Sequence, residues 1–243
     1  MKTTKIEWTE STWNPSIGCS KISAGCKNCY AEVMAKRLQA MGNLDYNNGF
    51  QFKLLPDRLS QPFNIKKSTK FFVNSMSDLF HEEMPFDFLD DIFEVITNTP
   101  HHSYQILTKR ENILYEYFSN RKVPKNVWLG VTVENENTKN RINILKSIDA
   151  TVRFISMEPL IDDIGKVDLK GIHWVIVGGE SGVSGRPMKS EWAESIYTQC
   201  DIQGVAFYFK QWGTWGSDGI KRNKKKNGSI FLGKEWREEP KVV

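Results

Sequence analysis

The sequence predicts an α/β fold built on a parallel sheet, and three observations support this prediction. Short, nearly continuous apolar runs, such as 127–133 and 174–177, have the composition of strands that are buried on both faces. Segments with helical apolar spacing, such as 86–97 and 111–118, separate these runs. The length of 243 residues is close to the roughly 250 residues typical of a β/α barrel. We therefore expect a partial or closed parallel β/α barrel of TIM-like type, with an open doubly wound sheet as the alternative.

The expected elements alternate along the chain. An extended lead-in runs from Ile6 to Ile17, and residues 43–69 show no clear pattern beyond a short strand at Gln51–Leu55. The expected later strands are 71–75, 104–108, 127–133, 152–156, 174–177 and 205–209. The expected helices are 30–41, 86–97, 111–118, 138–148 and 191–200.

Charge is distributed unevenly between the barrel and the C-terminus. We expect residues 1–212 to form the barrel, with a cysteine loop at 18–30, and residues 213–243 to form a basic extension. The net charge is +4, and residues 210–243 hold nine Lys/Arg against four Asp/Glu. The basic run at 221–226 suits contact with phosphates, and it suits a solvated loop equally well.

The sequence contains no sign of a membrane segment or a leader. No apolar run approaches the roughly 18 residues that span a bilayer, and the polar start does not resemble a signal peptide. We therefore expect a cytoplasmic protein without a membrane partner. Thiols stay reduced in that compartment, so clustered cysteines favour metal binding over disulfides.

Three of the four cysteines form a C-x6-C-x2-C cluster at Cys19, Cys26 and Cys29. Three thiolates leave a structural zinc site one ligand short, so zinc would require Cys200 or a histidine as the fourth ligand. Cys200 lies on an amphipathic helix and is expected in the core. The same three thiolates on a four-iron cluster would leave one iron open for a ligand. Thiolates select both zinc and iron–sulfur centres, so the spacing leaves both interpretations open.

Polar residues follow the end of every expected strand. In parallel α/β folds, ligands bind beyond the carboxyl ends of the strands, so these residues predict one active site. Lys109, Glu158 and Glu180 are the candidate catalytic side chains. The glycine-rich Gly178-Gly179-Glu180-Ser181-Gly182 does not match a dinucleotide or phosphate-loop motif. It would let a cofactor lie close to the backbone, or it forms a simple turn.

The ordered motifs of the chain resemble a known family. They are C-x6-C-x2-C-Tyr, Asn-Ser-Met-Ser-Asp-Leu-Phe-His, Leu-Thr-Lys-Arg, Gly-Val-Thr-Val-Glu-Asn, Ser-Met-Glu-Pro-Leu and Gly-Gly-Glu-Ser-Gly. Together they resemble the three-cysteine-motif family of phages and prophages, whose function is unassigned. The resemblance covers roughly residues 5–215. That family in turn resembles the radical S-adenosylmethionine (SAM) superfamily.

The resemblance implies a set of ligands and contacts. Cys19, Cys26 and Cys29 would hold a 4Fe-4S cluster whose open iron binds SAM, and cleavage of SAM would yield a 5′-deoxyadenosyl radical. An electron donor such as flavodoxin or ferredoxin would reduce the cluster. The residues that match SAM-contact positions are Asn74, Ser75 and Ser77 for the methionine amino group, Glu134 and Asn135 for the ribose, and Met157, Glu158, Gly178 and Gly179 near the adenine and methionine carboxylate. The lead-in and the five strands from 71–75 to 174–177 match the six-stranded core of the superfamily.

The chain departs from the superfamily pattern at two points. The superfamily's usual spacing is C-x3-C-x2-C with an aromatic residue before the third cysteine, whereas here the first gap is six residues, Asn28 precedes Cys29, and the aromatic is Tyr30. The Gly-Gly-Glu motif expected after the second strand is replaced by the segment from Asn74 to Asp78. Both departures affect where SAM would lie.

These observations favour a radical SAM-type iron–sulfur enzyme that modifies or repairs a nucleic acid or nucleoside. The phage association, the basic run and the aromatic residues Trp212 and Trp215, which suit base stacking, support that substrate class. A second protein that presents the substrate is a further expected partner. The alternative is a non-catalytic zinc or iron–sulfur module that binds nucleic acid. A SAM-independent metal hydrolase is disfavoured because the sequence has no His/Asp ligand pattern.

Overall fold

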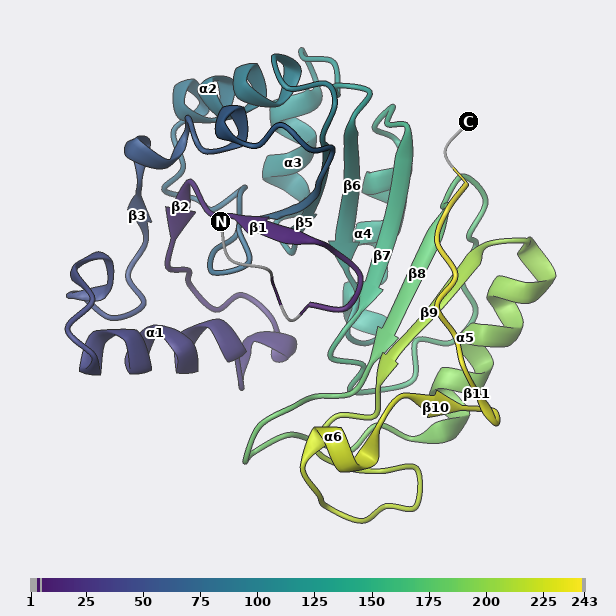
Figure 1. Cartoon of the computed structure of the whole chain (residues 1–243). Coiled ribbons are helices and arrows are strands. Elements are labelled where there is room, and N and C mark those ends of the chain that lie inside the picture. The colour runs from purple at the N-terminus through teal and green to yellow at the C-terminus, as the bar shows by residue number, and fades with distance from the viewer. Residues whose placement is uncertain (1–3, 5, 242–243) are drawn as a thin grey trace. The chain divides into compact units, whose positions relative to one another are not determined.

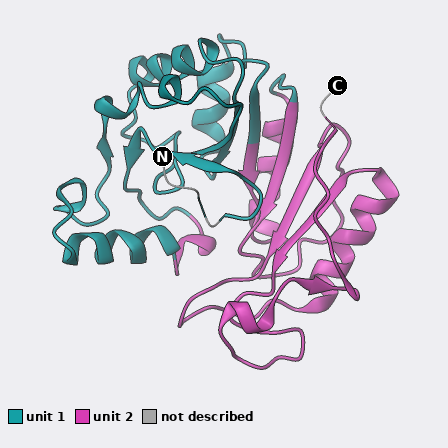
Figure 2. Cartoon of the chain, viewed as in Figure 1, with its two compact units in different colours: residues 1–22, 29–129, 148–151 teal, residues 23–28, 130–147, 152–243 magenta. Residues whose placement is uncertain are grey.

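The computed structural model describes residue 4 and residues 6–241 (Figure 1). The chain falls into two compact units (Figure 2). Unit 1 comprises the described residues up to Ile22 together with 29–129 and 148–151, and unit 2 comprises 23–28, 130–147 and the described residues from Val152 onward. No helix in this described part of the chain has the length and apolar character of a membrane span.

The main sheet has seven strands in the order β1-β4-β5-β6-β7-β8-β9. Its strands are β1 Ser11–Trp13, β4 Lys70–Val73, β5 Ser103–Thr108, β6 Val127–Thr132, β7 Val152–Met157, β8 Trp174–Gly178 and β9 Ala206–Gln211. The order follows the chain and has two different edge strands, so the sheet belongs to the partial-barrel class and is not a closed barrel. The predicted α/β fold with a parallel sheet is confirmed, with one strand more than the expected core of six because β9 pairs with β8.

In unit 1, β1, β4 and β5 pair in parallel, with Trp13 opposite Val73 and Val73 opposite Ile106. The helices of this unit are α1 Tyr30–Ala40, α2 Phe86–Thr97 and α3 Glu111–Phe118, and the short strands β2 Ser16–Ile17 and β3 Lys53–Leu54 form an antiparallel pair. The apolar positions of α2 recur every three or four residues and are buried. Phe93 of α2 stacks on Tyr117 of α3, with ring centroids 5.3 Å apart.

In unit 2, β7, β8 and β9 pair in parallel. The helices are α4 Arg141–Lys146, α5 Ser190–Gln203 and α6 Lys224–Asn227, and β10 Ile230–Phe231 pairs with β11 Lys234–Glu235. Helix α5 ends at Gly204, whose positive φ of 67° suits a left-handed cap. The C-terminal segment then runs antiparallel to β9, with the Phe209 amide bonded to the Trp236 carbonyl at 3.0 Å. This pairing covers an edge strand that would otherwise expose unpaired backbone groups.

Several predicted element boundaries differ from the structure for local reasons. The lead-in is two strands, β1 and β2, because Asn14-Pro15 interrupts it. The strand expected at 71–75 ends at Val73 because Asn74 is left-handed, with φ 58°. The helix expected at 138–148 is only α4, because a separate turn at Glu136–Thr138 precedes it.

Candidate functional site

In unit 1, the polar residues that follow β4 hold the chain on both sides of Cys19. The Asn74 side chain is buried, and its Nδ2 donates to Ser16 Oγ at 2.8 Å. Ser77 Oγ donates to the Gly18 carbonyl at 2.7 Å. The Tyr30 hydroxyl donates to the Ser75 carbonyl. Three of the residues predicted to contact a cofactor therefore also fix the entry and exit of the cysteine loop.

The centre of polar contacts in unit 1 is Arg110, which directly follows the Lys109 predicted as catalytic. Its side chain is 5% exposed, and its guanidinium donates to Cys19 Sγ at 3.4 Å, to Asp78 Oδ2 at 3.1 Å and to Glu82 Oε2 at 2.6 Å. For Lys109, the backbone amide donates to Asp78 Oδ2 at 3.0 Å. Arg110 is not among the site residues predicted from the sequence.

Ser20, next to Cys19, is fixed through its backbone and its side chain. Its amide donates to His81 Nε2 at 3.2 Å, and Arg110 Nη2 contacts its carbonyl at 3.2 Å and its hydroxyl at 2.7 Å. Burial and the charge of Arg110 lower the pKa of His81, so this ring is neutral near neutral pH and accepts the amide proton. Burial acts to raise the pKa of Glu82, but hydrogen bonds from Arg110 and Ser20 outweigh it and lower that pKa to about 2.

In unit 2, two glutamates contact the middle of the cysteine loop, residues 23–28. The first is Glu134, which follows β6. Its side chain is fully buried and accepts from Arg141 Nη1 at 2.9 Å and from Ser23 Oγ at 2.5 Å. Gly25 packs directly against it, because a Cβ atom at this glycine would lie 2.5 Å from Glu134 Oε1.

The second is Glu180, in the glycine-rich segment after β8. It is 5% exposed, and its Oε2 accepts from Asn28 Nδ2 at 3.0 Å. Arg186 pairs with the same carboxylate at 2.6 Å and also donates to the Ala24 carbonyl at 3.0 Å. Burial acts to raise the pKa of Glu180, but the hydrogen bonds from Arg186 and Asn28 outweigh it, so the net shift is downward.

The remaining predicted residues of unit 2 lie at the ends of β7 and β8 and, for Asn135, after β6. Glu158 pairs with Lys210 of β9 at 2.9 Å, and a Cβ at Gly178 would lie 3.3 Å from the Glu158 carboxyl. A Cβ at Gly179 would collide with the Trp212 carbonyl, so close backbone packing alone explains this glycine. Asn135 bonds with Thr138 in the turn before α4.

The four cysteines differ in their surroundings. Cys19 and Cys29 in unit 1 and Cys26 in unit 2 are half-buried thiols, whereas Cys200 is fully buried on α5. Burial raises the pKa of Cys200 to about 12, which keeps it a neutral thiol. The expectation that Cys200 is a core residue is confirmed. Within the described residues, no group of three or more His, Cys, Asp and Glu side chains is arranged to hold a metal ion by itself.

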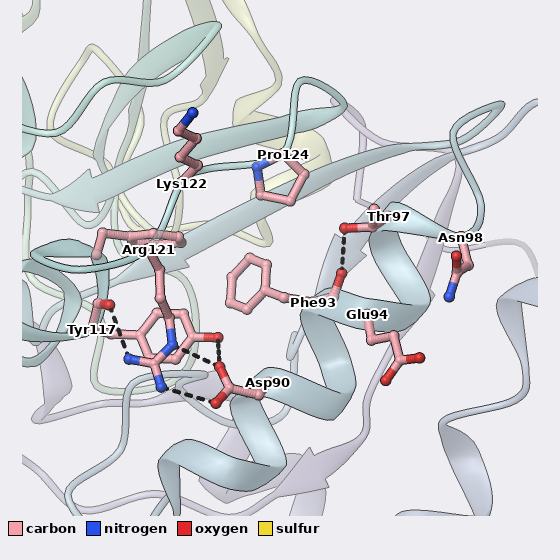
Figure 3. A pocket seen from close by; sticks show the side chains of 10 residues that line it. Asp90, Phe93, Glu94, Thr97, Asn98, Tyr117, Arg121, Lys122 and Pro124 are labelled. Carbon is pink, nitrogen blue, oxygen red and sulfur yellow. Dashed lines mark hydrogen bonds and ion pairs between the residues drawn. The ribbon is translucent and has the colours of Figure 1, made fainter.

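A groove of about 440 Å³ lies elsewhere in unit 1, between α2 and α3 (Figure 3). Two of its charged lining residues pair with each other: Arg121 Nε donates to Asp90 Oδ1 at 2.7 Å, and the Tyr117 hydroxyl donates to the same oxygen at 2.7 Å. None of the predicted site residues is among its lining residues. The groove therefore does not coincide with the candidate site.

The parallel sheet, with the cysteine loop after its first strand, defines an α/β protein of the radical SAM-like partial-barrel class. More particularly, the chain belongs to the family described as "Protein of unknown function (DUF5131)", whose model matches residues 3–240. No curated protein matches the sequence.

Two solved structures of spore photoproduct lyase are similar in fold. One is its complex with dinucleoside spore photoproduct, with a TM-score of 0.52, 11% identity and coverage of 82% of this chain. The other is a tyrosine-to-phenylalanine mutant, with a TM-score of 0.50, 11% identity, and coverage of 96% of this chain and 76% of that chain. In the first comparison the match spans only 62% of the length of the lyase chain. At these identities the similarity concerns the fold.

Proposed function

We propose that this protein is a radical SAM-type iron–sulfur enzyme in which Cys19, Cys26 and Cys29 are the ligands of a 4Fe-4S cluster. The observation that carries the proposal is the contrast between these half-buried thiols and the buried Cys200. Thiolates in a loop are the usual ligands of such clusters, and N–H groups that bond to their sulfurs tune the reduction potential. The Arg110 contact with Cys19 Sγ is a bond of that kind. When bound, such a cluster supplies the electron that cleaves SAM to a 5′-deoxyadenosyl radical.

Residues of the chain would then bind and orient SAM. Asn74, Ser75 and Ser77 would contact its methionine amino group, as the motif resemblance implies. Asn135 would contact the ribose, and Met157, Gly178 and Gly179 would lie near the adenine and carboxylate. Lys109 and Glu158 remain the candidate catalytic side chains. Flavodoxin or ferredoxin would be the electron donor.

We propose a nucleic acid or nucleoside as the substrate, in line with the phage association of the motif family. Lys224, Lys225 and Lys226 are exposed together on α6, where they suit contact with phosphates. The structurally similar spore photoproduct lyase is complexed with a dinucleoside, dinucleoside spore photoproduct. The stacking role expected of Trp212 is wrong, because its ring is 4% exposed and its Nε1 donates to the Ile230 carbonyl. Trp215 is half-buried, with its Nε1 bonded to the Gly185 carbonyl.

Anaerobic reconstitution tests the proposal. The purified protein should take up iron and sulfide in equal amounts and should release 5′-deoxyadenosine from SAM in the presence of a reductant. Cys26→Ala should abolish both properties, whereas Cys200→Ala should retain the cluster because that thiol lies in the core of unit 2. A colourless protein that holds zinc and does not cleave SAM would overturn the proposal in favour of the non-catalytic nucleic-acid-binding module. Loss of the cluster in both variants would show that the ligand set is incomplete.

A further inference from the structure

Four of the six residues in the segment 23–28 contact Glu134, Glu180 or Arg186, the arginine that pairs with Glu180. Ser23 donates to Glu134, and Gly25 packs against the same carboxylate. Asn28 donates to Glu180. The Ala24 carbonyl accepts from Arg186, which itself pairs with Glu180. The segment that carries Cys26 is therefore held from both ends by side chains that follow β6 and β8.

We propose that Glu134 and Glu180 are positioning residues that fix the segment 23–28 and thereby orient Cys26, rather than residues that contact a cofactor or the reacting atoms. The part of this inference that concerns cluster binding rests on the proposed function, because it takes Cys26 as a ligand. The inference revises two expectations from the sequence, which assigned Glu134 to the ribose of SAM and Glu180 to catalysis.

The oxygens of both carboxylates are already engaged inside unit 2. Glu134 Oε1 accepts from Ser23, and Glu134 Oε2 accepts from Arg141. Glu180 Oε1 accepts from Arg186 Nη2 at 2.6 Å, and Oε2 accepts from Asn28 and from the amide and Nε of Arg186. Since Glu134 is 0% and Glu180 5% exposed, a ribose hydroxyl would have to displace a buried charge-assisted bond, which is costly.

The arrangement also connects Glu134 to the sulfur of Cys26 through one hydroxyl group. Ser23 Oγ lies 2.5 Å from Glu134 Oε1 and 3.6 Å from Cys26 Sγ. A serine hydroxyl has a single proton to donate, and the charged carboxylate is the stronger acceptor. Ser23 therefore directs its lone pairs toward Cys26, and removal of Glu134 frees that proton to rotate toward the sulfur.

The first experiment measures the accessibility of Cys26 in the whole 243-residue chain without any metal. Iodoacetamide alkylation, followed by mass spectrometry, gives the rate at Cys26 relative to that at Cys29 in the same molecule. In Ser23→Ala, Asn28→Ala, Glu134→Gln and Glu180→Gln, this ratio should rise by about fivefold, the factor that one net hydrogen bond represents. Asp218→Asn is the control, because it removes a carboxylate from an ion pair with Arg222 in the same unit and should leave the ratio unchanged.

The second experiment measures the rate at which an iron chelator removes iron from the reconstituted variants. Loss of a residue that orients a metal ligand commonly weakens metal binding about 10- to 100-fold, so iron release should accelerate in the same four variants. Ser23→Ala and Asn28→Ala alter half-buried side chains, so the test does not depend on the glutamate variants folding. An unchanged alkylation ratio in these two variants would overturn the inference. If the wild type takes up no iron, the proposed function fails while the alkylation ratio still decides the positioning role.

Discussion

Two regions of the molecule hold the cysteine loop, and they do so with opposite charge. In unit 1 the central group is the Arg110 guanidinium, which contacts Cys19 Sγ directly. In unit 2 the central groups are the carboxylates of Glu134 and Glu180, which contact the neighbours of Cys26. The two regions therefore differ both in the sign of the charge and in whether the anchoring side chain reaches the sulfur itself.

Under the proposed function, the difference has an electrostatic reason. A cluster bound by three thiolates would be an anionic group, so a cation that donates to a sulfur would stabilise it, whereas an unpaired carboxylate nearby would oppose it. Each glutamate of unit 2 is paired with an arginine, Glu134 with Arg141 at 2.9 Å and Glu180 with Arg186 at 2.6 Å. The carboxylates can thus hold the chain around Cys26 without adding net negative charge.

Arg110→Ala should cause the largest loss of unfolding free energy. The variant would leave Asp78, which is buried, and Glu82 without their guanidinium partner, and breaking a buried ion pair in this way costs about 3–5 kcal/mol. Urea unfolding of the full chain measures the loss. The matched control is Arg121→Ala, which breaks an exposed pair with Asp90 in the same unit and should cost at most about 1 kcal/mol. Equal losses in the two variants would show that the Arg110 network does not stabilise unit 1.

The sequence predicted the strands better than the contacts of the site. Apolar runs such as 127–133 and 174–177 become buried strands because their composition alone requires burial on both faces. Asn74, Glu134 and Glu180 follow the carboxyl ends of β4, β6 and β8, as the strand pattern indicated. The boundaries that failed, such as that of α4, depend on a local turn in which Thr138 bonds to Asn135.

The hydrogen-bond partners of the site residues could not be predicted from the local sequence pattern. Ser23 and Glu134 are 111 residues apart in the chain, and Asn28 and Glu180 are 152 apart. A glutamate at the end of a strand can bond to a loop or face a cofactor, and its local sequence is the same in both cases. The choice between Lys109 and Arg110 likewise depends on which side chain turns inward after β5. The acidic partners of Arg110, Asp78 and Glu82, lie 32 and 28 residues from it in the sequence, so no local pattern marked this arginine.

Gly25→Ala tests the packing of the cysteine loop against Glu134 in unit 2. It should cause an intermediate loss of unfolding free energy. The new methyl group would lie 2.5 Å from Glu134 Oε1, and overpacking of this kind typically costs about 1–3 kcal/mol. The cost should be smaller when Glu134→Ala is already present, because the truncated side chain leaves room for the methyl group. A double-mutant cycle from urea unfolding measures this coupling. Additive losses would show that Gly25 and Glu134 do not pack against each other.

The smallest predicted effect is a pH-dependent loss of unfolding free energy, caused by protonation of Glu82 beside Arg110 in unit 1. The pKa of Glu82 is lowered from 4.5 to about 2 in the folded protein. Its stabilising contribution is therefore complete above the unfolded value and is lost as the pH falls from about 4.5 toward 2. Because the Glu82 side chain is 49% exposed, solvent screening should limit the contribution to less than about 1 kcal/mol.

Comparison of the wild type with Glu82→Gln isolates that contribution. The difference in unfolding free energy should be constant near neutral pH and should shrink toward zero as the pH approaches about 2. Added salt should reduce it at neutral pH, because a half-exposed pair is screened. Glu83→Gln changes the adjacent exposed carboxylate and serves as the control. A difference in unfolding free energy that persists undiminished at low pH would mean that Glu82 acts through packing or neutral hydrogen bonds. The ion pair of Arg110 that stabilises unit 1 would then be the one with Asp78 alone.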